Sequence, residues 1–190
     1  MPELEKADML SVLLLGRGRQ LERRFSLVLR GESMVPFFTE GQTVTVDCAL
    51  EGSIGVGEVI VFEQAGKLCA HRVLARRLRD GEICYVEKGD NQLGRTIVRH
   101  DEVLGNVVAI DGRPLPLSTG VAACAARRFY ARTAYALTSV PGLLNFAPLR
   151  PIMRKLPSIE AGTRRLCLRA SRGLLKLLMF VFETPDSVKI

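Results

Sequence analysis

The sequence predicts a mainly β fold, a compact antiparallel sheet or barrel-like domain followed by a helical C-terminal extension. Short strand-like runs follow one another, and glycine-containing turns separate them with no regular helix between. Near residue 118 the composition then changes to alanine-rich, basic runs of helical type. The chain is therefore divided into an N-terminal helical segment (1–23), a β domain (24–117) and a basic helical extension (118–190).

Each expected strand combines β-branched or apolar residues with turn residues at its ends. The expected strands cover residues 25–30, 43–48, 58–63, 68–78, 83–88 and 102–110. Asp80-Gly81, between two of these runs, is typical of a tight hairpin turn. Side chains alternate between the two faces of a strand, so His71 and Arg72 are expected on opposite faces of the 68–78 strand.

The C-terminal extension predicts two or three helices, because prolines interrupt its helical runs. Breaks are expected at Pro141-Gly142, Pro148, Pro151 and Pro157. The apolar run 174–182 is nine residues long, too short to span a bilayer, and the basic residues near it favour an interfacial helix. Packing on its own domain or on a partner protein is the alternative. Against the single acid Glu160, the basic residues of 120–176 are Arg127, Arg128, Arg132, Arg150, Arg154, Lys155, Arg164, Arg165, Arg169, Arg172 and Lys176.

The composition restricts the partners. A net charge of +7 favours an anionic surface, either phospholipid or nucleic acid, but the absence of tryptophan and an aromatic content of 6% argue against nucleic acid bound by base stacking. Five cysteines without a CxxC pair, and only two histidines, argue against a zinc site and favour a reducing compartment. We expect a cytoplasmic protein without metal or cofactor. Its basic helices are candidates for peripheral contact with an anionic membrane on the cytoplasmic face, or with a partner protein.

The candidate nucleophile is Ser33, in the segment Gly31-Glu32-Ser33-Met34-Val35-Pro36. The segment follows an expected strand, so a tight turn there can project the serine hydroxyl outward. Met34 and Pro36 follow the serine and are the candidate substrate-binding residues. They are expected to fix the turn, because proline restricts both its own φ and the preceding residue. An ordinary loop serine is the alternative.

A serine hydroxyl needs a base within hydrogen-bond reach, and the base needs an orienting partner. His71 is the candidate base, because an imidazole titrates near neutral pH. Asp90 is the first candidate for the orienting carboxylate and Asp101 the second. The structural alternatives are a strand histidine bonded to a carbonyl, an Asx-turn acceptor for Asp90, and a solvated charge for Asp101.

Several short sequence blocks occur in a fixed order between residues 25 and 110. The blocks are Gly31-x-Ser33-Met34-x-Pro36, Gly41 before a valine-rich strand, Gly57-Glu58-Val59-Ile60-Val61-Phe62, His71-Arg72-Val73-Leu74, Lys88-Gly89-Asp90-Asn91 and Val103-Leu104-Gly105-Asn106-Val107. In this order and spacing they resemble the S24/S26 serine peptidase superfamily, which includes the signal peptidases and the LexA-type self-cleaving repressors. The block that begins at His71 resembles the version with a histidine base, found in endoplasmic-reticulum, archaeal and sporulation-type signal peptidases, where other members have lysine.

The resemblance implies a serine endopeptidase of the signal peptidase class, with Ser33 as nucleophile and His71 as base, that cleaves a leader or precursor peptide. In histidine-type enzymes a further aspartate follows the block like 88–91, but 92–96 contains no acid, which leaves Asp90 as the expected third member. No membrane anchor or helix-turn-helix is expected before Ser33, so cleavage beyond a membrane and DNA reading are not expected. A catalytically inactive peptide-binding or regulatory module with the same fold is the alternative.

Overall fold

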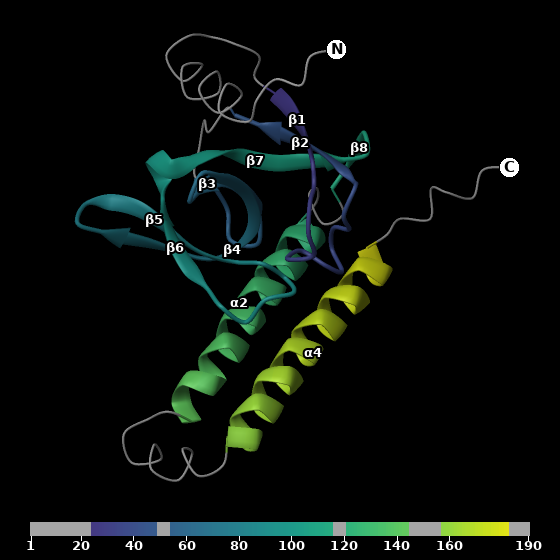
Figure 1. The fold of residues 1–190 in the computed structure, drawn as a ribbon. Coiled ribbons are helices and arrows are strands. Elements are labelled where there is room, and N and C mark those ends of the chain that lie inside the picture. The colour runs from purple at the N-terminus through teal and green to yellow at the C-terminus, as the bar shows by residue number, and fades with distance from the viewer. Residues whose placement is uncertain (1–23, 49–53, 116–120, 145–156, 183–190) are drawn as a thin grey trace, which may run out of the picture.

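The computed structural model describes residues 24–48, 54–115, 121–144 and 157–182 (Figure 1). Within its helices, side chains are described for 121–139 and 161–180. The N-terminal helical segment expected over 1–23, and the breaks expected at Pro148 and Pro151, lie outside the described residues.

The described residues form one antiparallel sheet and two long helices. The elements are β1 (Arg24–Val28), β2 (Thr43–Asp47), β3 (Val59–Gln64), β4 (Lys67–Arg79), β5 (Glu82–Lys88), β6 (Thr96–Arg99), the 3₁₀ turn η2 (His100–Glu102), β7 (Val103–Ile110), β8 (Arg113–Pro114), α2 (Val121–Leu144) and α4 (Pro157–Phe182). The strand order is β1-β2-β7-β3-β4-β5-β6, with β8 paired to β7, and Figure 1 shows the sheet strongly curled. The predicted mainly β fold with a helical C-terminal extension is confirmed.

Two predictions about elements are wrong. Strand β6 is missing from the expected strands because its sequence lacks apolar alternation. In the structure only Val98 of its four residues is buried. The break at Pro141-Gly142 is absent, since α2 continues to Leu144. One proline near the C-terminal end of a helix removes a single N–H from the hydrogen-bond ladder, and the helix tolerates that loss here. The predicted boundary at Pro157 is confirmed, because α4 begins there and proline suits the first turn of a helix.

The two faces of β4 pack into two different apolar clusters. Leu74 is buried with Phe37, Phe38 and the inner valines of β2 and β3, while Val73 packs with Phe62 and Tyr85. The alternation predicted for this strand is therefore confirmed, and it sends His71 and Arg72 to opposite sides of the sheet. The Asp80-Gly81 turn is also confirmed: both residues have positive φ, 52° and 83°, as a tight hairpin of this kind requires.

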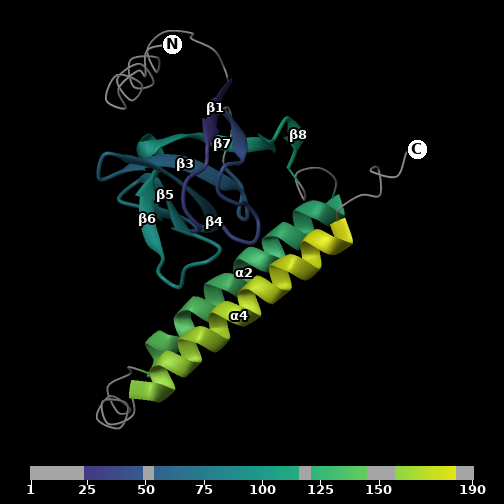
Figure 2. The same ribbon diagram turned by 45° about the vertical axis from the view of Figure 1, so that its right-hand side comes forward.

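Helices α2 and α4 lie side by side and extend past the sheet, as the two views in Figures 1 and 2 agree. Tyr130, Ala131 and Ala134 of α2 and Leu175 of α4 are buried in the same cluster as Leu74, so the helices share a core with the sheet. One side of the apolar run in α4 thus packs on its own chain. No helix in the described ranges has both the length and the hydropathy needed to cross a bilayer.

Candidate active site

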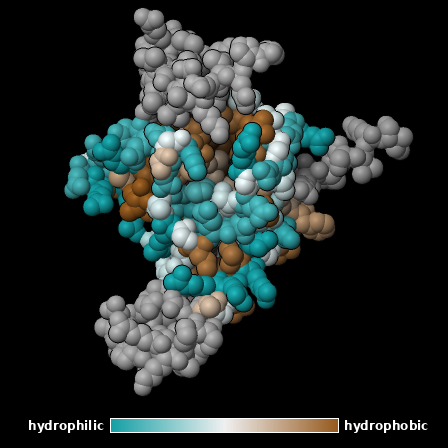
Figure 3. Space-filling view, viewed as in Figure 1, coloured by the Kyte–Doolittle hydropathy of each residue, from teal (hydrophilic) through white to brown (hydrophobic). Residues whose placement is uncertain are grey.

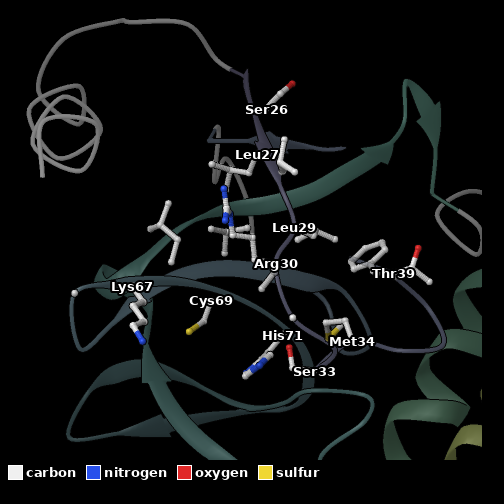
Figure 4. Close-up of a pocket in the computed structure, with 17 residues that line it drawn as sticks. Ser26, Leu27, Leu29, Arg30, Ser33, Met34, Thr39, Lys67, Cys69 and His71 are labelled. Atoms are coloured by element: carbon white, nitrogen blue, oxygen red, sulfur yellow. The ribbon is translucent and has the colours of Figure 1, made fainter. Parts of the chain in front are cut away.

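Ser33 stands at the end of a pocket of about 640 Å³, a volume typical of ligand sites. Its side chain is half-buried, in the turn that follows β1, and Met34 beside it is buried. Ser33 and His71 both line the pocket, and Figure 4 shows their side chains at the same end of it. Met34 also lines it, whereas Pro36 is not among the described residues that do, so the pocket supports only one of the two predicted substrate contacts. The apolar lining residues are Leu27, Val28, Leu29, Met34, Phe38, Val61, Leu68 and Ala70.

The pocket lies between two strand edges. β1 is the first strand of the sheet and pairs only with β2, which leaves its other edge open among the described residues. β4 pairs with β5 only from Arg72 onward, so residues 67–71 have β3 as their only partner in the described sheet. Residues 26–31 and 66–71 line the pocket from these two sides. The slot is therefore bordered by backbone N–H and C=O groups that an extended peptide can bind.

His71 is held by a buried carboxylate. Its Nδ1 lies 2.6 Å from Oε2 of Glu87, which is 2% exposed. A carboxylate accepts hydrogen bonds, so the proton belongs on Nδ1, and Nε2 becomes the nitrogen with a free lone pair. Thr96 Oγ1 donates to the second oxygen of Glu87, and the ring of Phe62 packs edge-on against the imidazole. The arrangement fixes both the orientation and the tautomer of His71.

The carboxylate that orients His71 is therefore Glu87 and not Asp90. Asp90 is 1% exposed and forms a two-pronged ion pair with Arg72, with Nε–Oδ1 2.9 Å and Nη2–Oδ2 2.7 Å. Tyr130 of α2 donates a further hydrogen bond to Asp90, at 3.1 Å. Asp101 lies on the surface beside Arg99, at 2.9 Å. The expectation failed because Arg72 and His71 face opposite sides of β4, and Asp90 is on the Arg72 side.

Asp90 serves the site indirectly, through the turn that holds Ser33. The Asn91 backbone N–H donates to the Ser33 carbonyl at 2.7 Å, and the Asn91 side-chain amide donates to the Glu32 carbonyl at 3.1 Å. Gly89 lies so close that a Cβ there would be 2.7 Å from the Ser33 carbonyl oxygen. The ion pair between Asp90 and Arg72 ties this turn to the strand that carries His71. The two predicted site segments are thereby joined through residues 88–91.

The charges around this turn are strongly affected by burial. Burial lowers the pKa of Lys88 to about 8, against the opposing effect of Asp90, and its Nζ donates to the Gly89 carbonyl at 2.9 Å. Burial also tends to lower the pKa of Arg72, but the Asp90 carboxylate outweighs it and the pKa is raised. Lys88 pairs in register with Arg72 and so lies on the side of the sheet away from His71. It is therefore not positioned as an alternative base for Ser33.

Cys69 is the other nucleophile type in the pocket. Burial raises the pKa of its thiol, and the Glu87 carboxylate raises it further. A thiol with a raised pKa is mostly protonated at neutral pH and is a poor nucleophile. Ser33 is therefore the better candidate. Within the described ranges, no cluster of three or more histidine, cysteine, aspartate or glutamate residues could hold a metal ion.

Sequence reasoning overlooked Glu87, although a signal for it was present. An acid inside the run Ile83-Cys84-Tyr85-Val86-Glu87, next to the turn 88–91, is unusual for a strand that is buried along most of its length. A buried carboxylate needs a partner. Glu87 pairs in register with Val73 of β4, and His71, two residues away on the same face of that strand, is its hydrogen-bond partner.

We expect Gly89→Ala to lower kcat/KM for a cleaved peptide by about 10²-fold, because its Cβ must displace the Ser33 carbonyl and with it the nucleophile. Gly94→Ala is the matched control: a Cβ at Gly94 meets no atom within 4 Å, so its kcat/KM should stay near that of the wild type. Steady-state kinetics on one peptide measures both. Equal rates for the two variants would show that the 88–91 turn does not position Ser33.

Comparison of the chain with models of known protein families and with curated proteins found no match.

Proposed function

We propose that this chain is a serine endopeptidase of the signal peptidase-like class, which cleaves a leader or precursor peptide held in extended form. The observation that supports this most is that His71, which lines the same pocket as Ser33, is paired with the buried Glu87. A base with a fixed tautomer beside a serine hydroxyl is the arrangement that nucleophilic catalysis requires. In the described part of the chain the Ser33 hydroxyl makes no hydrogen bond, so it is available to His71 and to substrate.

The proposed reaction uses the Oγ of Ser33 and the Nε2 of His71, while Glu87 holds the Nδ1 of the imidazole. Nε2 of His71 accepts the Ser33 proton as Oγ attacks the scissile carbonyl carbon, and Glu87 stabilises the resulting imidazolium. The same proton passes to the leaving amine as the C–N bond breaks, which leaves an acyl-enzyme. Water, deprotonated by Nε2, then attacks the ester carbonyl carbon. As the C–O bond to Ser33 breaks, Nε2 returns the proton to Oγ and the acid product is released. The N–H groups of Ser33 and Met34 have no acceptor among the described residues and are the candidates to bind the oxyanion.

The slot between β1 and β4 favours a peptide substrate over a small ester. An extended chain can hydrogen-bond to both open edges, while its alternate side chains point into the apolar pocket. Lining residues such as Leu29, Val61 and Ala70 are apolar and suit small or aliphatic side chains of the substrate. The cleavage site should therefore lie in an extended, apolar stretch of the substrate.

Labelling with a fluorophosphonate, which reacts with activated serines, tests the proposal. The probe should modify the wild-type chain at Ser33, as mapped by mass spectrometry, and labelling should fall away in His71→Ala. Ser26 also lines the pocket, on β1, so Ser26→Ala is a matched control that should label as the wild type does. If the folded chain takes up no probe but retains peptides from an extended-peptide library, it is the inactive binding module instead.

Glu87→Gln should lower kcat by about 10²- to 10⁴-fold, because the glutamine amide can present a donor to Nδ1 and favour the wrong tautomer of His71. KM should change little, since Glu87 is buried behind the imidazole and is not among the residues that line the pocket. The two parameters are measured by steady-state kinetics.

Glu82→Gln, at the exposed start of β5, is the matched control and should keep the wild-type kcat. Thermal melts of both variants separate a loss of catalysis from a loss of folding. A Glu87→Gln variant with unchanged kcat would remove Glu87 from the catalytic group and leave it a structural role.

A further inference from the structure

Helix α4 has an exposed apolar stripe on the side away from the core. Leu166, Gly173, Leu177 and Phe180 recur at spacings of seven, four and three residues, which places them on one face of a helix. Phe180 is 78% exposed, Leu166 67% and Leu177 59%. Cys167 and Leu175 occupy the opposite face and are buried. The stripe is therefore not used by the fold of this chain within the described residues.

Basic residues border this stripe on one side. Arg165, Arg169, Arg172 and Lys176 follow the same helical spacing, displaced around the helix from the apolar residues. None of the four forms an ion pair with another described residue. Three of them, Arg165, Arg169 and Lys176, are exposed. The outer face of α4 thus combines an apolar strip with a row of free positive charges.

Helix α2 repeats the same pattern. Phe129 is 58% exposed and lies among the exposed Ala125 and Ala136, with Arg128 and Arg132 beside it. In Figure 3, apolar patches alternate with hydrophilic side chains in the lower part of the molecule, where Figure 1 places the two helices. Neither helix contains an acid among its described side chains. Their basic residues are Arg127, Arg128, Arg132, Arg164, Arg165, Arg169, Arg172 and Lys176, of which Arg127 pairs with Glu58.

We propose that the outer face of the α2–α4 hairpin docks on an anionic lipid bilayer, parallel to its surface. The charge selects an anionic partner, and the apolar stripe selects one that also offers a hydrocarbon phase just below its charged surface. A nucleic acid satisfies the basic residues but gives Leu177 and Phe180 no apolar environment. The inference is independent of the catalytic proposal, because it uses no residue of the Ser33 pocket. It places the protein, when bound, at a membrane surface.

Co-sedimentation of the full chain with vesicles tests the inference. The vesicles contain either phosphatidylglycerol mixed with phosphatidylcholine or phosphatidylcholine alone. We expect binding to the anionic vesicles only. Leu177→Glu/Phe180→Glu and Arg165→Gln/Arg169→Gln/Lys176→Gln should each lower the partition coefficient by at least about tenfold, from lost insertion and lost attraction respectively. Ser33→Ala should bind as the wild type does.

Matched control variants carry the same kinds of substitution on the sheet instead of on the helices. Leu78→Glu/Ile97→Glu adds the same charge at exposed apolar positions of β4 and β6, and Arg76→Gln/Arg79→Gln/Arg113→Gln removes the same charge from exposed basic positions. Both should change the partition coefficient by less than about twofold, since the affected side chains lie off the hairpin. Circular dichroism confirms folding of every variant.

Four results would overturn the inference. The first is no sedimentation of the wild type with anionic vesicles. The second is an equal loss in hairpin and control variants, which would mean that net charge alone governs binding. The third is a concentration-dependent dimer in analytical ultracentrifugation that Leu177→Glu/Phe180→Glu dissociates, which would assign the stripe to a second copy of the chain. Binding of RNA that is insensitive to this double variant, without vesicle binding, would assign the charges to nucleic acid.

Discussion

Replacing Ser33 or His71 by alanine is expected to lower kcat/KM for a cleaved peptide by about 10⁴-fold or more. Without the hydroxyl no acyl-enzyme forms, and without the imidazole the hydroxyl keeps its proton at neutral pH. The two losses should not add in the double variant, because the two groups act in the same step. The peptide is chosen from an extended-peptide library digested by the wild-type chain, and new termini are identified by mass spectrometry.

The folded state should survive both substitutions. Ser33 is half-buried in a turn, and its hydroxyl makes no hydrogen bond among the described residues, so the loss of the hydroxyl should change the free energy of unfolding by less than about 0.5 kcal/mol. His71→Ala leaves Glu87 without one partner, so His71→Gln serves as a second variant that retains a donor. Ser26→Ala, on β1, should keep full activity. Turnover that persists in folded Ser33→Ala would assign catalysis to another residue.

The sequence predicts Ser33 and His71 as a pair, and both line the same pocket, but it does not predict the carboxylate bonded to the histidine. The reason is geometric. Asp90 is the predicted third member because it lies in the 88–91 block and residues 92–96 contain no acid, but linear spacing does not reveal which side of β4 that block faces. Arg72 and His71 are adjacent, yet side-chain alternation sends them to opposite faces. A register shift between Val73 and Ala75, where β4 pairs with β5, decides which carboxylate reaches the imidazole. Such a shift leaves no trace in local composition.

The prediction of the fold succeeded where local sequence signals are strong. It failed where contacts between distant segments determine the structure. The 68–78 strand and the Asp80-Gly81 turn follow from alternation and turn chemistry. β6 pairs with β5 through backbone hydrogen bonds, while its exposed side chains give no apolar periodicity. Arg95, just before β6, donates to Thr138 and Ser139 of α2 at 3.1 and 3.0 Å, so this segment is held by a helix more than 40 positions along the chain. Contacts of that range cannot be read from a local pattern.

Arg72→Met should reduce the free energy of unfolding by about 3–5 kcal/mol, the largest stability effect we expect from a single change, because it leaves the Asp90 carboxylate buried without its countercharge. Arg72 also donates to the Gly57 carbonyl at 2.9 Å, and its guanidinium lies 4.2 Å from the centre of the Phe37 ring. The variant therefore disturbs the turn 88–91, the Phe37 side of the core and Tyr130 of α2 together. Urea denaturation followed by circular dichroism measures the loss.

A double-mutant cycle separates the buried charge from the lost packing. Arg72→Met/Asp90→Asn removes both charges, and it should recover part of the stability lost in Arg72→Met, because an amide is less costly to bury than an unpaired carboxylate. Arg79→Met is the surface control. The Arg79 side chain is 72% exposed and lies 3.7 Å from the exposed Asp80, so this substitution should change the free energy of unfolding by less than about 0.5 kcal/mol. If Arg72→Met were no less stable than Arg79→Met, the Arg72–Asp90 pair could not be what joins the Ser33 turn to the strand of His71.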